Sequence, residues 1–209
     1  MNIAILGAGT VGGTLGKGLA KAGHQITYAV RDPEAAKTKA VVEQTGSGAS
    51  AADVPSAVAS SDIVLLCTPW DATKDALAGA GDLRGKVVLD CTNPLTSDLS
   101  LAEGHTTSGG EMVAEWARDA RVVKIFNTTG CPNMANPRYG NEDATMFYCG
   151  DDAQAKDAAH HLARDLGFDP VDAGPLKQAR LLEPLAMLWI SLALVQKHGV
   201  NIAFKLMHR

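Results

Sequence analysis

The chain has 209 residues, of which 46% are hydrophobic and 20% charged, proportions typical of a globular protein with a buried core. The formal net charge is -4 and no cluster of lysine or arginine occurs, which disfavours nucleic acid and anionic membranes as partners.

The first 22 residues form a recognisable unit. Residues 1–6 are an apolar run, residues 7–12 read Gly-Ala-Gly-Thr-Val-Gly, and an amphipathic segment covers residues 13–22. A strand, a glycine turn and a helix in this order are typical of a dinucleotide-binding site. Gly7 suits a tight turn, Gly9 lets the backbone approach a pyrophosphate, and Gly12 lets the helix pack closely on the strand. A glycine turn of purely structural use is the alternative.

Apolar runs then alternate with helical segments. The expected strands cover residues 25–30, 47–50, 62–67, 86–90 and 121–126, and the expected helices cover 33–44, 51–60, 70–78 and 111–120. Residues 95–110 have no periodicity and are expected to be a long loop. The alternation predicts an α/β fold, a Rossmann doubly wound parallel sheet.

From residue 127 the pattern changes, beginning with a loop rich in glycine, proline and asparagine at 127–138. Strands are expected at 145–149 and 169–172, and helices at 151–166 and 176–197, the last with a kink or break at Pro184. We therefore expect two domains, a dinucleotide-binding domain over 1–126 and a small C-terminal α/β lobe over 127–209. The recurrence of Leu182, Leu185, Trp189 and Leu192 at helical spacing predicts a homodimer seam.

The cysteines and the apolar tracts indicate the cellular compartment in which the protein is expected. The four cysteines lie far apart in the sequence, which favours buried thiols of a cytoplasmic protein over a metal or redox pair. The N-terminus does not resemble a signal peptide, and the apolar tract at 184–195 is expected to be too short to span a bilayer.

Arg31 follows the second strand, where the adenosine ribose of a dinucleotide would lie. An arginine there can pair with a 2′-phosphate and so favours NADP, whereas an acid favours NAD. Asp32 comes next, and the count from Gly12 fits either residue. We expect Arg31 to face the phosphate and Asp32 to cap the following helix.

Small polar residues and prolines follow three further strands, as Thr68-Pro69-Trp70, Thr92-Asn93-Pro94 and Asn127-Thr128-Thr129. Ligands bind at the carboxyl ends of strands in such sheets, so these segments are expected to line the crevice. Trp70 can stack on a flat ring or cover apolar surface, and Asn93 and Asn127 can donate to a ligand carbonyl or cap turns.

The sequence contains no nucleophile elbow and no histidine spacing typical of a metal site. The adjacent His160 and His161 are expected at the surface, and His105 is a weak candidate for substrate contact. No catalytic residue and no metal ligand is therefore assigned.

The glycine motif, Thr68-Pro69-Trp70, residues 123–128, residues 149–152 and residues 172–183 together resemble two related families. These are the NADPH:F420 oxidoreductases, which exchange a hydride between NADP and the deazaflavin coenzyme F420, and the cytosolic domain of the six-transmembrane ferric reductases, which uses NADPH and a flavin. The resemblance runs from Ile3 to Glu183, nearly the whole chain.

The resemblance implies a cytoplasmic NADP-dependent oxidoreductase with dimer contacts. The motif, the strand ends and the resemblance together place NADP on Gly7, Gly9, Thr10, Val11, Gly12, Arg31, Thr68, Pro69, Trp70, Asn93 and Cys131. The acceptor, F420 or another flavin, is expected on Asn127, Thr128 and Thr129. Two other functions remain open: an NADP-binding sensor or scaffold without turnover, and a dehydrogenase of a small imine or hydroxyacid.

Overall fold

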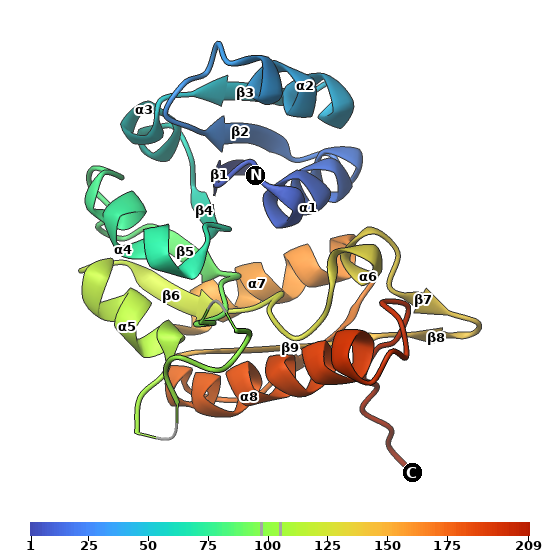
Figure 1. Ribbon diagram of the computed structural model, residues 1–209. Helices are drawn as coiled ribbons and strands as arrows, with labels where there is room; N and C mark the ends of the chain where they lie inside the picture. Colours follow the sequence, from blue (N-terminus) through green and yellow to red (C-terminus); the bar gives the residue numbers. More distant parts are fainter. Residues whose placement is uncertain (97, 105) are drawn as a thin grey trace.

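The computed structural model describes residues 1–96, 98–104 and 106–209 (Figure 1). His105, the candidate for substrate contact, lies outside the described residues. The strands are β1 (Asn2–Leu6), β2 (Gln25–Ala29), β3 (Ala49–Ala52), β4 (Ile63–Leu66), β5 (Val87–Asp90), β6 (Arg121–Lys124), β7 (Arg138–Tyr139), β8 (Glu142–Asp143), β9 (Thr145–Gly150) and β10 (Asp169–Asp172). The helices are α1 (Thr10–Lys21), α2 (Ala36–Thr45), α3 (Val54–Ala59), α4 (Trp70–Ala78), α5 (Gly109–Trp116), α6 (Cys131–Ala135), α7 (Ala153–Asp165) and α8 (Ala179–Ile190), with the short helices η1 (Leu176–Gln178) and η2 (Ser191–Val195) at the two ends of α8.

The principal sheet has eight strands in the order β10-β9-β6-β5-β4-β1-β2-β3. All neighbouring strands are parallel except β6 and β9, which pair antiparallel at Val123–Gly150 and Lys124–Cys149. The order of the first six strands is that of a doubly wound dinucleotide-binding sheet, which confirms the predicted fold class. The carboxyl ends of β1, β4, β5 and β6 therefore lie along one edge.

Helices cover both faces of the sheet, and alternate side chains of each strand point into one or the other layer. Ile3 and Ile5 of β1 pack with α1 and α7, whereas Ala4 and Leu6 pack with α3, α4, α5 and α8. Because both faces are covered, the central strands are apolar throughout, as in Ile63–Leu66.

The C-terminal part of the chain extends the same sheet. β9 lies beside β6, and β10 adds a parallel strand at the edge. The division at residue 126 into two domains stays a prediction.

The last long helical segment differs from expectation at Pro184. Of the expected kink or break, the break is wrong, because α8 continues through Pro184 and runs alongside β9 (Figure 1). The inward face of α8 is buried, and that packing holds the helix together across the missing N–H. The longer helical run Leu176–Val195 has 20 residues and contains an 18-residue window with a mean hydropathy of 1.3, so by length and composition alone it could span a bilayer, although the apolar tract at 184–195 is shorter. A third of that window is buried inside the fold.

Two local elements were not expected from the sequence. The loop at 127–138 contains the short helix α6, and the hairpin of β7 and β8 follows it. In addition, α1 begins at Thr10 and α5 at Gly109, earlier than expected in both cases.

Candidate active site

The glycine turn between β1 and α1 is closely packed. Gly7 has a φ of 103°, and a Cβ there would lie 2.6 Å from the carbonyl oxygen of Cys67. A Cβ at Gly12 would lie 2.0 Å from the carbonyl oxygen of Gly7. Both positions therefore require glycine, for the turn and for the approach of α1 to β1 as predicted.

Gly9 is different, since a Cβ there would meet nothing within 4 Å. Gly9 precedes α1 and supplies no side-chain cap, so the first N–H groups of this 12-residue helix have no side-chain acceptor at the cap. Open space beside free N–H groups suits a pyrophosphate, which fits a dinucleotide in this turn.

Arg31, after β2, is exposed, and within the described ranges it takes part in no hydrogen bond or ion pair. Asp32 is held by its own turn: its Oδ1 accepts from the backbone N–H of Glu34 at 3.0 Å, and its carbonyl accepts from Thr38 Oγ1 at 3.0 Å. Asp32 thus caps the turn before α2 rather than the helix itself, which begins after Ala35. The guanidinium is left as the free charged group at this strand end.

The segment after β4 forms the start of α4. Thr73 Oγ1 donates to the carbonyl of Pro69 at 2.9 Å, and the hydroxyls of Thr68 and Thr73 lie 2.9 Å apart. Trp70 packs on Trp116 of α5 with 5.3 Å between ring centroids. This contact corresponds to the alternative in which Trp70 covers apolar surface.

Asn93 and Asn127, after β5 and β6, are bonded to each other. Asn93 Nδ2 donates to the backbone carbonyl of Asn127 at 3.1 Å, and Asn127 Nδ2 donates to Asn93 Oδ1 at 3.2 Å. Asn127 Nδ2 also donates to the carbonyl of Leu182 in α8 at 3.1 Å. The structure therefore brings together two predicted site residues and one carbonyl of the C-terminal helix.

The backbone before Asn127 is strained. Phe126 is fully buried and has a φ of 62°, a left-handed conformation that is uncommon for an aromatic residue. Such conformations persist where the surrounding structure holds them and concentrate at functional sites.

The loop after Thr128 is fixed by the C-terminal end of the chain. Thr129 Oγ1 accepts from Asn133 Nδ2 at 2.7 Å, and Asn133 Nδ2 also donates to the carbonyl of Ile202. A Cβ at Gly130 would lie 2.4 Å from the indole of Trp189, so this glycine allows close contact between the loop and α8. Thr128 is buried, with its hydroxyl toward Met146.

Cys131 begins α6 and is half-buried. Burial raises the pKa of its thiol, and a hydrogen bond with Thr14 of α1 partly offsets this. The contact joins the predicted cofactor residue Cys131 to the helix that carries Thr10 and Val11. All four cysteines are free, with Cys91 and Cys149 buried and Cys67 and Cys131 half-buried.

Below the strand ends lies a buried ion network, defined by Lys124, Asp90 and Glu183. Lys124 Nζ is 2.8 Å from Asp90 Oδ2 and 2.9 Å from Glu183 Oε1, and none of these side chains is exposed. The Glu183 carboxylate also accepts from the backbone N–H groups of Gly109 and Gly110, at 2.9 Å each, at the start of α5. Burial alone would lower the pKa of Lys124, but the charges of Asp90 and Glu183 outweigh it and raise the pKa, so Lys124 stays protonated.

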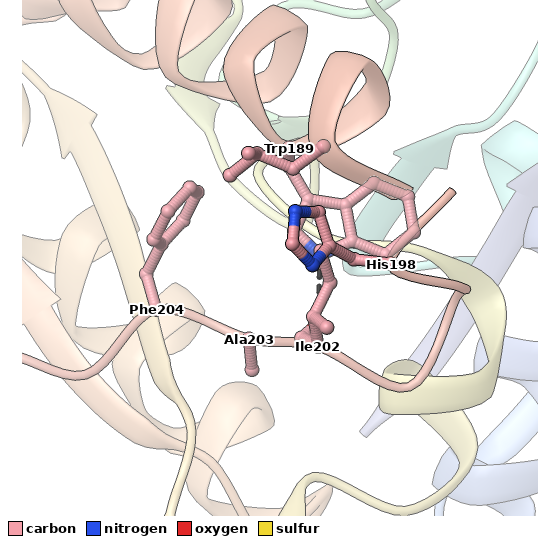
Figure 2. Close-up of a pocket in the computed structure, with 6 residues that line it drawn as sticks. Trp189, His198, Ile202, Ala203 and Phe204 are labelled. Atoms are coloured by element: carbon pink, nitrogen blue, oxygen red, sulfur yellow. Dashed lines mark hydrogen bonds between the residues drawn. The ribbon is translucent and has the colours of Figure 1, made fainter. Parts of the chain in front are cut away.

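A small apolar hollow of about 180 Å³ lies between α8 and the C-terminal segment (Figure 2). Figure 2 shows Trp189 and the hydrogen bond from its Nε1 to the carbonyl of Ile202, which measures 2.7 Å. The residues that line the hollow include none of those predicted to contact NADP or the acceptor. We therefore place the candidate site at the strand ends and not in this hollow.

The sequence did not indicate that Trp189, Glu183 and Lys124 hold the strand ends and the following loops in place. Only the apolar periodicity of the last helix hinted at a buried face there. No local pattern pairs Lys124 with a carboxylate nearly sixty residues later in the chain.

Comparison with known proteins places the chain among NADP-dependent enzymes. Residues 2–94 match the family model described as NADP oxidoreductase, coenzyme F420-dependent. The F420-dependent NADP reductase of Methanothermobacter thermautotrophicus is 30% identical over 97% of this chain and 94% of its own length. Metalloreductase STEAP3 of Rattus norvegicus is 29% identical over 89% of this chain, but the chain spans only 37% of that protein.

Two solved structures of similar proteins superpose on this chain. A candidate F420-dependent NADP reductase from Arthrobacter sp. FB24 superposes with a TM-score of 0.90 and 32% identity over 100% of both chains. The reductive aminase of Aspergillus terreus, solved with NADPH4, cyclohexanone and allyl amine, superposes with a TM-score of 0.67 and 26% identity over 93% of this chain and 62% of that one.

Proposed function

The chain belongs to the F420-dependent family of NADP oxidoreductases, and on this premise we propose that it transfers a hydride between NADP(H) and a flavin-like acceptor, with the deazaflavin coenzyme F420 as the first candidate. The observation that carries the choice of acceptor is the extent of the similarity. Relatives described as F420-dependent match over 94% to 100% of their own length, whereas the match to the reductive aminase covers 62% of that chain. The F420-dependent relatives therefore contain little beyond the matched region, whereas more than a third of the reductive aminase lies outside it.

The residues present fit NADP. The open space at Gly9 and the uncapped start of α1 suit the pyrophosphate, and the free guanidinium of Arg31 suits the 2′-phosphate. When bound, NADPH supplies the hydride that reduces the acceptor. Asn93, Asn127 and Thr129 at the strand ends would hold the reacting rings.

The chain's own contribution is alignment. The ends of β5 and β6 are fixed by the paired asparagines and by the buried ion network, so the floor of the crevice is rigid. A rigid floor that aligns two flat rings lowers the entropic part of the barrier without a protein acid or base.

An imine substrate is the second candidate, because the reductive aminase shares the fold at 26% identity. Reduction of an imine calls for a proton donor near the substrate nitrogen. After β5 and β6, the predicted site residues offer the amides of Asn93 and Asn127 and the hydroxyls of Thr128 and Thr129, which are poor proton donors, and this favours the flavin-like acceptor.

We also propose that the protein works as a cytoplasmic homodimer. Four free cysteines suit a reducing compartment. A stripe on α8 and η2 leaves apolar side chains in solvent, with Leu181 64%, Leu188 50% and Val195 63% exposed. Leu182 and Trp189, expected in the seam, are instead buried against their own chain, and Leu192 lines the apolar hollow. We therefore assign the seam to an outward stripe of Leu181, Leu188 and Val195, with the half-buried Leu185 beside them.

The experiment that tests the proposed acceptor is steady-state oxidation of NADPH with oxidised F420, FMN, FAD, or cyclohexanone with allyl amine. We expect the highest kcat/KM with F420. A higher value for the ketone and amine would transfer the assignment to imine reduction.

A further inference from the structure

Two cysteines that are far apart in the sequence lie opposite each other on neighbouring strands at the crevice. β4 and β5 pair in parallel with Leu66 opposite Asp90, and the N–H of Cys91 donates to the carbonyl of Leu66 at 3.0 Å. The register therefore continues by one residue, which puts Cys67 opposite Cys91. Neighbouring strands are about 4.8 Å apart, within the range of about 4.4–6.8 Å between the Cα atoms of a disulfide.

The two thiols lie in the same layer of the fold. Alternate side chains of a strand share a face, so Cys67 lies on the face of Leu65 and Cys91 on that of Leu89. Leu65, Leu89 and Cys91 belong to the core cluster on the α1 side of the sheet, and Cys67 packs against it. Burial first, and then a hydrogen bond with the Cys67 thiol, raise the pKa of Cys91 well above its ordinary value. The side chains of the pair therefore interact directly.

The two thiols differ in access. Cys67 is half-buried and Cys91 is buried, so a small oxidant in solution reaches Cys67 first. An accessible cysteine beside a second thiol that can resolve it is an arrangement common among redox-sensitive proteins. Within residues 1–96, 98–104 and 106–209, no group of three or more ligand-type side chains could hold a metal ion, so oxidation of sulfur is the chemistry that this pair offers.

The end of β4 also contacts the turn predicted to hold the pyrophosphate. The N–H of Cys67 donates to the carbonyl of Leu6 at 2.8 Å, and a Cβ at Gly7 would lie 2.6 Å from the carbonyl oxygen of Cys67. Thr68, a predicted NADP contact, comes next in the chain. A bond of about 2.05 Å between the two sulfurs draws Cys67 toward β5 and so moves the backbone against which the glycine turn packs.

We propose that Cys67 and Cys91 form a reversible disulfide when the protein meets hydrogen peroxide, and that this disulfide weakens the binding of NADP(H); the second part rests on the proposed function. The Cys67 sulfur attacks one peroxide oxygen: an S–O bond forms, the O–O bond breaks, and the departing hydroxide takes the thiol proton and leaves as water. The Cys91 sulfur then attacks the Cys67 sulfur: an S–S bond forms, the S–O bond breaks, and a second water leaves with the Cys91 proton. Two thiols and one peroxide thus give one disulfide and two waters.

The bridge is expected to be easily reduced. Side chains on neighbouring strands stand side by side and do not point at each other, so a bond between them is strained, and strained disulfides are the readily reduced ones. A dithiol reductant restores both thiols and itself becomes a disulfide. The pair is therefore reduced in a reducing compartment and is bridged when peroxide is present.

Peptide mapping tests the bond in the folded wild type. Trypsin separates the four cysteines, with Cys67 in 40–74, Cys91 in 87–118, Cys131 in 125–138 and Cys149 in 139–156. After peroxide treatment the remaining thiols are blocked, and the digest is analysed by mass spectrometry without reductant. We expect the peptides of Cys67 and Cys91 to be linked, and dithiothreitol to remove the link. A link from Cys67 to Cys131 instead, or no link between the expected peptides, overturns the proposal.

Two variants test the order of attack. In Cys91→Ser the resolving thiol is missing, so Cys67 is expected to stop at the sulfenic acid, which dimedone traps. Cys149→Ser is the matched control, because Cys149 is buried in the layer on the other face of the sheet, and it should form the disulfide as the wild type does. Absence of a dimedone adduct on Cys67 in Cys91→Ser overturns the assignment of Cys67 as the attacking thiol.

Titration with NADP tests the effect on the cofactor. The oxidised wild type is expected to bind NADP roughly tenfold more weakly than the reduced protein, and by reciprocity NADP should disfavour the disulfide. Peroxide-treated Cys67→Ser should keep the affinity that it had before treatment, which separates the disulfide from oxidation of methionine. Equal affinity of the oxidised and reduced wild type overturns the effect on NADP. A reduced wild type that does not bind NADP overturns the proposed function, whereas the peptide map decides the disulfide independently.

Discussion

Glu183 of α8 and Lys124 of β6 form an ion pair of 2.9 Å with neither side chain exposed. Lys124 also pairs with Asp90 of β5, and Glu183 also accepts from two N–H groups at the start of α5. One buried network thus joins the C-terminal helix to the strands that end in the crevice. Leu182, the residue before Glu183, accepts from Asn127, so the position of α8 bears directly on the site.

Glu183→Ala is expected to lower the free energy of unfolding by about 3–5 kcal/mol, because it leaves a buried lysine short of one counter-charge. Glu183→Gln keeps an oxygen for Gly110 and Lys124 but turns an amide N–H toward the N–H of Gly109, and it should cost less than removal of the whole group. Urea denaturation measures both. Glu115→Ala, an exposed position on α5, is the control and should change stability by about 0.5 kcal/mol or less. A loss for Glu183→Ala as small as that of the control contradicts the role of the network.

Arg31→Ala is expected to weaken NADP binding by about 1.5–3 kcal/mol, the range for hydrogen bonds to charged groups, and to leave NAD binding almost unchanged. Calorimetric titration with each dinucleotide measures the difference. Asp32→Asn is the control, because the Asp32 side chain accepts from the backbone of its own turn. Equal losses of NADP and NAD affinity in Arg31→Ala would show that Arg31 acts structurally.

Leu188→Glu is expected to convert a dimer into monomers, because it puts a charge in the middle of the outward stripe of α8. Sedimentation at micromolar concentration measures the mass. Leu99→Glu changes a leucine that is 45% exposed on a different segment and should leave the dimer intact. The proposed seam is wrong if the wild type itself sediments as a monomer.

The free energy of unfolding is expected to depend on pH through the carboxyl group of Glu111. Hydrogen bonds from Arg180, made to both carboxylate oxygens at 2.7 Å, hold the pKa of Glu111 below its ordinary value, and Ser108 adds to this against the effect of burial. Because the pKa is lower in the folded state, the pair stabilises the protein above the ordinary glutamate pKa of about 4.3, and this stability is lost as the pH falls through the folded value.

The wild type is therefore expected to exceed Glu111→Gln in unfolding free energy by about 1 kcal/mol at pH 7, and the difference should shrink toward zero below about pH 4. Urea denaturation across that range measures it. A difference that does not change with pH would rule out the carboxylate as its source.

The parts of the fold that the sequence predicted correctly depend on short-range sequence patterns. Gly7 and Gly12 mark the turn because no other residue fits their surroundings, and the apolar run of β4 marks a strand buried on both faces. The predicted sheet and its crevice edge follow from such signals. They are short-range, and they specify backbone more than side-chain contacts.

The rest depends on contacts between distant residues. Pro184 looked like a break, but packing of the inward face of α8 overrides its local effect. The fit of Trp189 against Gly130 and the pairing of Glu183 with Lys124 join segments far apart in the chain, which no spacing rule can foresee. Among the charged residues of the site, Arg31 can be interpreted from its local position, because a charge at a strand end requires no partner from elsewhere in the chain, and its contact with a 2′-phosphate stays a prediction.

The central claim is direct transfer of a hydride between NADP(H) and a flavin-like acceptor in one crevice. The most direct measurement uses NADPH stereospecifically deuterated at C4 of the nicotinamide, with oxidised F420 and the wild-type protein, and follows the label in reduced F420 by mass spectrometry and NMR. Transfer of the deuterium from one of the two C4 diastereomers to C5 of the deazaflavin is the predicted result. Reduced F420 without label from either diastereomer, or no reduction at all in protein saturated with NADPH, would contradict the account.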